Sequence, residues 1–156
     1  MKEIKIHFCD FGDMEGIAKK IINILSSHFD VILDSKNPEY LFYSVFGVEH
    51  IHYDCVRIFY TGENITPNFN ICDYAIGFEH IQFLDRYIRY PLYLFYEADF
   101  EKALHKHENI SSKTLQNKTR FCNFIVSNGR ADPLREATFR ALNAYKKVDS
   151  TGKIPQ

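Results

Sequence analysis

Short apolar runs alternate along this 156-residue chain with segments of helical periodicity, and this alternation limits the folds that are open to it. Ile4 to Phe8 is typical of a buried strand, and from Met14 to Phe29 apolar residues recur at helical spacing on one face. Pro133 begins a predicted helix to about Lys147, with Asp132 as its N-cap. Further strand candidates are Val31 to Leu33, Tyr40 to Val45, Val56 to Tyr60, Tyr74 to Ile76 and Phe121 to Val126. The pattern predicts an α/β fold, a Rossmann-like, mainly parallel sheet with flanking helices on both faces.

Size and composition predict one compact domain with one core. A chain of this length suits a single domain, which we place at residues 1–150, with residues 151–156 as the start of a linker. A hydrophobic share of 46% is typical of a globular protein. Between Tyr93 and Lys118 the pattern weakens, and we expect one helix and a mobile loop there.

The charge balance excludes a general attraction to nucleic acid or to an anionic membrane. The chain carries 19 basic and 20 acidic residues, and its basic residues form no patch interleaved with aromatic side chains. No apolar run approaches the roughly 20 residues of a membrane span. The first residues are typical of a strand rather than a signal peptide. We therefore expect no nucleic-acid partner, no membrane span and a cytoplasmic segment, with any peripheral membrane attachment lying in residues outside it.

The cysteines and histidines do not predict a metal site. Four cysteines lie in or beside apolar runs without C-x-x-C spacing, which favours buried free thiols: Cys9, Cys55, Cys72 and Cys122. His50, His52 and Cys55 could be drawn as metal ligands, but alternate residues of a strand share a face for purely geometric reasons. We expect no metal at these residues.

The segment from Arg57 to Gly77 carries the main functional signal. The apolar run Val56 to Tyr60 ends at Thr61-Gly62 and leads directly into Glu63-Asn64. This order places a carboxylate at the carboxyl end of a strand, and ligands of open α/β sheets bind at that edge.

The same segment resembles the signature of the family 10 glycosyltransferases, the α-1,3/α-1,4-fucosyltransferases. The matching residues are Phe59, Gly62-Glu63-Asn64, Pro67, Phe69 and Asp73 to Phe78, with further matches at Asp54 to Arg57, Asp85 to Tyr93, Lys118 to Asn128, Arg135 and Tyr145 to Ser150. The resemblance extends over roughly residues 40–152. It implies the N-terminal, acceptor-side half of a GT-B type enzyme, whose partner would be a C-terminal donor-binding domain that this chain lacks.

The resemblance also implies a reaction, the transfer of L-fucose with inversion from GDP-fucose to N-acetylglucosamine of a glycan, with an α-1,3 linkage expected. Glu63 matches the proposed base of the family, and a residue that only caps a turn is the alternative. Asn64 is expected to bind the acceptor, although Asn after Gly-Glu is also ordinary turn chemistry. Phe59, Tyr60 and Phe69 are expected to desolvate the Glu63 carboxylate partly. The absence of a D-x-D pair agrees with a transferase that uses no metal and no cofactor besides its donor substrate.

Two residues are expected to contact the donor. Arg135 lies in the first turn of the helix that Pro133 begins and matches an arginine that the family uses toward the donor phosphates, with a solvated surface arginine as the alternative. Gly152 falls where the family has a glycine-rich turn, although Thr151 departs from that pattern.

Two further alternatives remain open. Aromatic residues downstream of Glu63 could form a stacking platform for a sugar, but core packing is favoured: Tyr74, Phe78, Tyr87 and Tyr90. The rival function is a non-catalytic, flavodoxin-like binding or interaction module, in which the turn from Phe11 to Gly16 holds an anion or nothing. As the acceptor-side part of a transferase, the chain alone is expected to show no fucosyl transfer and to bind GDP-fucose only weakly.

Overall fold

The computed structural model describes residues 1–12, 14–105, 112–126 and 132–151, and the chain divides into two compact units, Met1–His105 and Lys106–Gln156. The first unit contains two buried clusters, one on each face of its sheet, and the second unit contains a separate one. The expectation of a single core is therefore wrong, because the last part of the chain buries apolar side chains among themselves. The domain boundaries at residues 1–150 and 151–156 stay a prediction.

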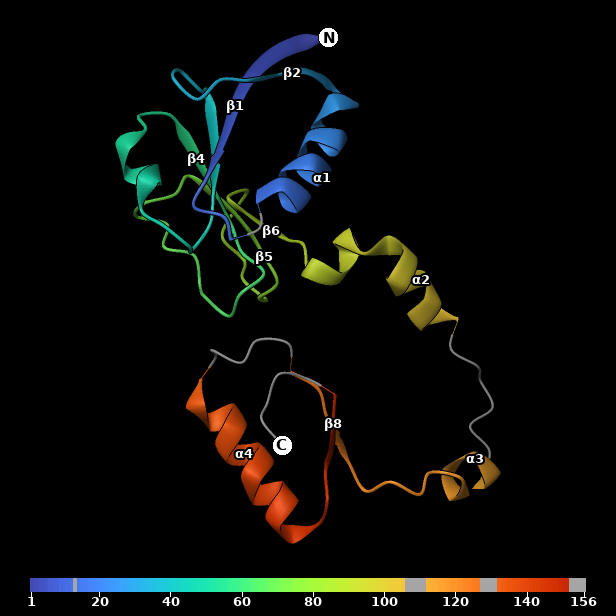
Figure 1. The fold of residues 1–156 in the computed structure, drawn as a ribbon. Helices are drawn as coiled ribbons and strands as arrows, with labels where there is room; N and C mark the ends of the chain where they lie inside the picture. The colour runs from blue at the N-terminus through green and yellow to red at the C-terminus, as the bar shows by residue number, and fades with distance from the viewer. Residues whose placement is uncertain (13, 106–111, 127–131, 152–156) are drawn as a thin grey trace. The chain divides into compact units, whose positions relative to one another are not determined.

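The first unit is built on a six-stranded sheet in which every neighbouring pair is parallel (Figure 1). Its strands are β1 (Lys2–Cys9), β2 (Phe29–Leu33), β3 (Tyr40–Tyr43), β4 (Val56–Tyr60), β5 (Tyr74–Gly77) and β6 (Tyr87–Arg89). The strand order is β2-β1-β3-β4-β5-β6, so the direction of winding reverses between β1 and β3. The predicted α/β fold with a mainly parallel sheet is confirmed, and β6 is a strand that the sequence pattern did not predict.

The helix α1 (Met14–Ser26) packs beside β1 and β2 through the apolar face that its periodicity predicts. It ends earlier than expected. Ser27 Oγ donates to the Ile24 carbonyl at 2.7 Å and the His28 amide donates to the Leu25 carbonyl at 2.9 Å. These bonds close the last turn, and Phe29, which we predicted as helical, is the first residue of β2.

Both faces of the sheet are buried, which explains the dense apolar runs of its strands. One face packs beneath α1 and the 3-10 helix η2 (Leu92–Phe95), with buried residues Ile4, Ile6, Phe8, Ile21, Phe42, Tyr60 and Phe95. The other face lies on the side of loops and the 3-10 helix η1 (Glu49–His52), with buried residues Cys9, Leu41, Tyr43, Phe59, Cys72 and Ala75. Because side chains alternate along a strand, consecutive residues Phe59 and Tyr60 of β4 belong to opposite faces.

Two helices occupy the region where we expected one. These are α2 (Glu97–Leu104) in the first unit and α3 (Ser112–Gln116) in the second. Residues 106–111, between these two helices, lie outside the described residues, so the mobile loop expected within this stretch of the chain stays a prediction. Within the described part of the chain, no helix is long and apolar enough to cross a membrane.

The second unit contains β7 (Asn123–Phe124) and β8 (Asp149–Ser150), which pair in parallel, and α4 (Pro133–Tyr145). Phe139 and Val148 form its buried cluster. The predicted N-cap is confirmed, because the Asp132 carboxylate accepts a hydrogen bond from the Leu134 amide at 2.8 Å. The strand expected over residues 121–126 is only two residues long in the structure.

Candidate active site

The carboxyl ends of the adjacent strands β1, β3 and β4 border a pocket of about 270 Å³. It is lined by Phe11, Gly12, Ile17, Ser44, Phe46, Tyr60, Gly62, Glu63, Leu92 and Tyr96. Its walls thus come from the loops that follow these three strands, from α1 and from the η2 region. Glu63 lines this pocket, as the order of strand and acid in the sequence suggested. Its role as a base stays a prediction.

The backbone at Glu63 is held while its side chain is exposed. The Glu63 amide donates to Thr61 Oγ1 at 2.9 Å, and Thr61 is only 3% exposed. The Glu63 carbonyl accepts from the Ile65 amide at 2.8 Å, which closes a tight turn. The backbone that carries the carboxylate is therefore fixed beside the pocket.

The three rings expected to desolvate Glu63 partly do not gather around it, and Glu63 is exposed. Tyr60 shares the pocket with it, but Phe59 packs on the opposite face of the sheet. Phe69 packs with Phe83, their ring centroids 4.6 Å apart. Phe59 is close to Glu63 along the chain, but side chains alternate between the two faces along β4, so Phe59 points away from the pocket.

Asn64 is exposed and does not line the pocket. It follows Glu63 in the same turn. Its expected contact with the acceptor stays a prediction.

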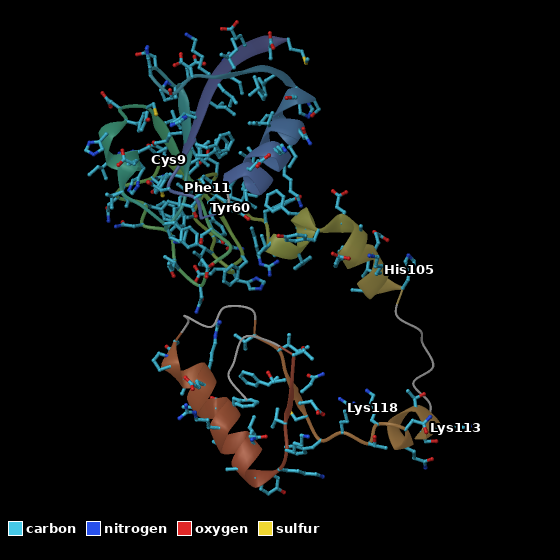
Figure 2. The ribbon with its side chains drawn as sticks, in the orientation of Figure 1. Cys9, Phe11, Tyr60, His105, Lys113 and Lys118 are labelled. Carbon is cyan, nitrogen blue, oxygen red and sulfur yellow. The ribbon has the colours of Figure 1, made fainter. Side chains whose placement is uncertain are left out.

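Four aromatic residues line the pocket: Phe11, Phe46, Tyr60 and Tyr96. Tyr60 stacks on Phe11, which lies next to it in Figure 2, with ring centroids 6.0 Å apart and planes at 18°. Tyr60 also packs edge-on against Phe95, with ring centroids 5.7 Å apart. The Tyr60 hydroxyl is buried and has no hydrogen-bond partner among the described residues. Burial raises the pKa of Tyr60 to about 12, and the neighbouring Tyr96 and Tyr90 contribute to the rise. The hydroxyl therefore stays protonated at neutral pH beside the apolar rings.

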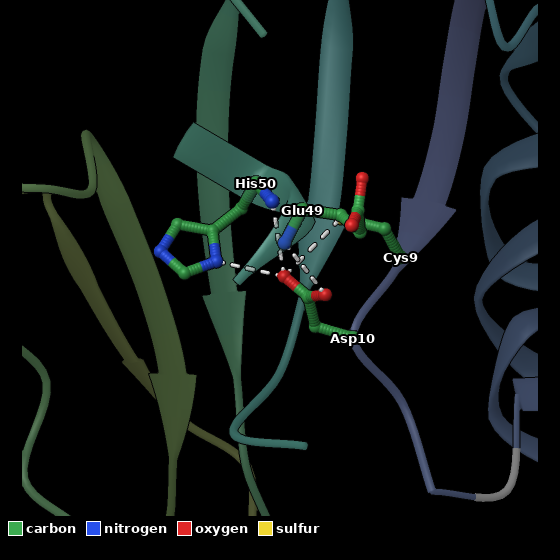
Figure 3. Close-up of polar contacts among 4 residues, drawn as sticks. All are labelled: Cys9, Asp10, Glu49 and His50. Atoms are coloured by element: carbon green, nitrogen blue, oxygen red, sulfur yellow. Dashed lines mark hydrogen bonds and ion pairs between the residues drawn. The ribbon is translucent and has the colours of Figure 1, made fainter. Parts of the chain in front are cut away.

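A carboxylate that the sequence analysis missed lies beside the pocket. Asp10, directly after β1, accepts hydrogen bonds from the amides of Glu49 and His50, both at 3.0 Å, and from His50 Nδ1 at 2.7 Å (Figure 3). The Cys9 thiol also donates to it at 3.6 Å. The sequence suggests His50 only as a possible metal ligand, whereas in the structure it is a partner of Asp10. The available signal was an aspartate at the carboxyl end of a strand next to the reversal in strand order.

The ionisation of this group follows from its partners. Burial acts to raise the pKa of Asp10, but the hydrogen bonds from His50 and Glu49 outweigh burial and hold that pKa below its ordinary value. Burial, together with the charge of Asp10, raises the pKa of the Cys9 thiol to about 12. At neutral pH a protonated thiol therefore lies beside an ionised carboxylate.

The residues suggested as metal ligands or buried thiols can now be placed. Among the described residues, no group of three or more His, Cys, Asp or Glu side chains is arranged to hold a metal ion. All four cysteines are free. Cys9 and Cys72 are buried as predicted, whereas Cys55 and Cys122 are only partly buried.

Arg86 fixes the loop that follows Glu63 and Asn64. Its guanidinium donates to the carbonyls of Phe69 at 3.2 Å and of Cys72 and Asp73 at 2.6 Å each. It also lies 5.3 Å from the ring centroid of Phe69 and 5.2 Å from that of Phe83. A side chain directly before β6 thus holds residues 69–73, which the family signature includes.

Core packing decides the position of two of the four suspected platform residues. Tyr87 packs against the face of the sheet that contains Phe59, and Tyr90 packs against the face that contains Tyr60. Tyr74 is 41% exposed and Phe78 is partly buried. None of the four lines the pocket that contains Glu63.

Neither of the two residues expected to contact the donor is among the residues that line this pocket. Arg135 belongs to the second unit, where it is exposed in the first turn of α4. Gly152 lies outside the described residues. Both roles stay predictions.

Comparison with known proteins decides the family. The family model for the N-terminal domain of the α-(1,3)-fucosyltransferase FucT matches residues 6–96 of this chain. This range includes Asp10, His50 and Glu63. The chain belongs to this family. It is 34% identical over 133 aligned residues to the α-(1,3)-fucosyltransferase FucT of Helicobacter pylori, and the match covers 63% of this chain and 26% of that protein.

Solved structures of α1,3-fucosyltransferases share the fold. A crystal structure with GDP-fucose is 26% identical with a TM-score of 0.63, and one without a named ligand is 30% identical with a TM-score of 0.66. Both matches cover 99% of this chain, and they cover 54% and 55% of the solved chains. The chain therefore spans about half the length of these structures and about a quarter of the curated relative.

Proposed function

We propose that this chain is the acceptor-side part of an α-1,3-fucosyltransferase, which transfers L-fucose with inversion from GDP-fucose to N-acetylglucosamine of a glycan. The observation that carries the proposal is Glu63, a carboxylate in the wall of a pocket at the carboxyl edge of a parallel sheet, within the residues that match the family. The names of the relatives, one of them solved with GDP-fucose, support the donor and the reaction.

The chemistry assigns one task to Glu63. Its carboxylate takes the proton of the acceptor hydroxyl while that oxygen attacks the anomeric carbon of fucose, and GDP leaves from the opposite face of the sugar. Aromatic rings of the pocket suit the apolar face of a pyranose. Because Glu63 is exposed in this chain, the bound acceptor itself would exclude water from the carboxylate.

The donor side needs groups beyond this pocket. Arg135, in the first turn of α4, is suited to the donor diphosphate because a guanidinium and the amides of a helix N-terminus act on the same anion. Gly152 and a separate donor-binding domain would complete that side. Neither a metal nor a further cofactor has a role in the proposed mechanism.

The test is Glu63→Gln in the protein that contains this chain, assayed for transfer from GDP-fucose to N-acetyllactosamine. The amide keeps the shape of the side chain but cannot accept the proton, so turnover should fall by about 10²–10⁴-fold. The apparent affinity for GDP-fucose should stay nearly unchanged. Glu3→Gln is the matched control, because Glu3 is exposed near the opposite end of β1 and does not line the pocket.

Two outcomes would contradict the proposal in different ways. If Glu63→Gln keeps more than about a tenth of the turnover, the base lies elsewhere. If the unaltered protein transfers no fucose to any galactose-containing acceptor, the non-catalytic binding module becomes the better interpretation.

A further inference from the structure

The loop after β3 is tied to the loop after β1 through one residue, Asp10. The Asp10 carbonyl accepts from the Phe46 amide at 3.0 Å. Its carboxylate accepts from the Glu49 and His50 amides and from His50 Nδ1 (Figure 3). These bonds fix residues 46–50 at both ends. We call this set of contacts the Asp10 clamp.

The Asp10 clamp is buried and closely fitted. The Asp10 side chain is 2% exposed and that of His50 is 9% exposed. The His50 ring stacks on Tyr43 of β3, with centroids 4.1 Å apart and planes at 17°. Asp10 has a φ of 60°, in the left-handed region that residues other than glycine rarely adopt. A residue whose backbone is held in this conformation, with several partners on its side chain, marks a constrained position.

The clamped loops form one wall of the pocket that contains Glu63. Phe11 and Gly12 follow Asp10 directly, and Ser44 and Phe46 come from the loop that the clamp holds. The two loops lie close together at Gly12, where an added Cβ would be only 3.2 Å from the Phe46 ring. Glu63 reaches the same pocket from β4. The position of Phe46 relative to Glu63 therefore depends on the hydrogen bonds of Asp10.

We propose that Asp10, together with His50, is a positioning residue that fixes the Phe46 wall of the pocket so that the acceptor hydroxyl meets Glu63. The inference rests on the proposed function. A carboxylate that only stabilised the fold would contribute to the free energy of unfolding and would leave the affinity for the acceptor unchanged.

The experiment compares Asp10→Asn with Asp34→Asn in the protein that contains this chain. Asp34 is the matched control, since its carboxylate likewise accepts from two amides of the following loop, those of Lys36 and Asn37 at 2.9 and 3.0 Å, but that loop does not line the pocket. Hydrogen exchange of the Phe46, Glu49 and His50 amides measures the clamp. Steady-state kinetics with N-acetyllactosamine and GDP-fucose measures the pocket.

Asp10→Asn should speed exchange at these amides and raise the KM for the acceptor by about ten- to a hundredfold, with a smaller change in the KM for GDP-fucose. Asp34→Asn should change neither. His50→Phe keeps the ring on Tyr43 but removes the Nδ1 donor, so it should raise the acceptor KM in the same direction by less. This second variant keeps the test valid if Asp10→Asn does not fold.

Normal acceptor KM values in Asp10→Asn and His50→Phe would overturn this inference alone and leave Asp10 as a structural residue. An equal rise in Asp34→Asn would also overturn it, because loosening any loop would then suffice. Absence of transfer by the unaltered protein would overturn the proposed function and this inference with it.

Discussion

Gly47→Ala tests the fit of the Asp10 clamp through stability alone. A Cβ on Gly47 would lie 2.3 Å from Asp10 Oδ1 and 3.0 Å from its Cγ, so the carboxylate has to move. Oδ1 accepts from the Glu49 amide, and a hydrogen bond to a charged group contributes about 1.5–3 kcal/mol. Gly47 does not have a positive φ, so alanine also restricts the unfolded chain, which stabilises by about 0.4–1 kcal/mol. The net loss should be about 0.5–2.6 kcal/mol in the free energy of unfolding, measured by urea denaturation.

Gly62→Ala is the matched control for this measurement. Its Cβ would lie 3.2 Å from Leu92 Cδ2, the end of a flexible side chain, and the expected change is within about 1 kcal/mol. A double-mutant cycle isolates the contact. In an Asp10→Gly background, where glycine accepts the φ of 60° and the carboxylate is gone, Gly47→Ala should no longer destabilise. An undiminished loss in that background would show that the clash with Asp10 is not the cause.

Two further predictions concern acid stability and the donor. Because the folded-state pKa of Asp10 lies below its ordinary value of 3.8, the stability that its charge contributes is fully present above that pH and is lost as the pH falls through the folded pKa. The stability difference between the unaltered chain and Asp10→Asn in urea unfolding should therefore shrink below pH 3.8, and a difference that grows there would contradict the assignment. Arg135→Ala should raise the KM for GDP-fucose more than it lowers turnover, because a lost phosphate contact weakens binding of the donor in the ground state. Initial rates over a range of donor concentrations measure this KM. An unchanged KM would mean that Arg135 is only a surface residue.

The sheet could be predicted from the sequence because its strands are short, dense apolar runs. The bounds predicted for the strand from Val56 to Tyr60 are those of β4, and the predicted cap at Asp132 is confirmed. The strand β6 could not be predicted in this way. Its residues Tyr87–Arg89 are only partly buried or exposed, so they lack the apolar pattern that a strand buried on both faces shows.

The candidate site could be predicted only in part, for a physical reason. Glu63 follows its strand directly, so local order placed it at the carboxyl edge. The Asp10 clamp joins Asp10 to Glu49 and His50, which follow it by 39 and 40 positions in the chain. Nothing in the local sequence pattern links these residues. The second core escaped prediction because its two buried residues, Phe139 and Val148, are isolated among exposed neighbours.

The topology also bears on the rival function. In a sheet of order β2-β1-β3, the loops after β1 and β3 diverge where the winding reverses, and this gap is where a flavodoxin-like protein binds its ligand. Here the Phe46 amide donates a hydrogen bond to the Asp10 carbonyl, and the Asp10 carboxylate accepts from the first amides of η1. These hydrogen bonds join the two loops at the point where the strand order reverses. An ionised carboxylate at this point disfavours an anion in the turn that follows β1. The pocket borders this turn through Phe11 and Gly12 and also contains Glu63, so an anion bound there would lie near two carboxylates, those of Asp10 and Glu63.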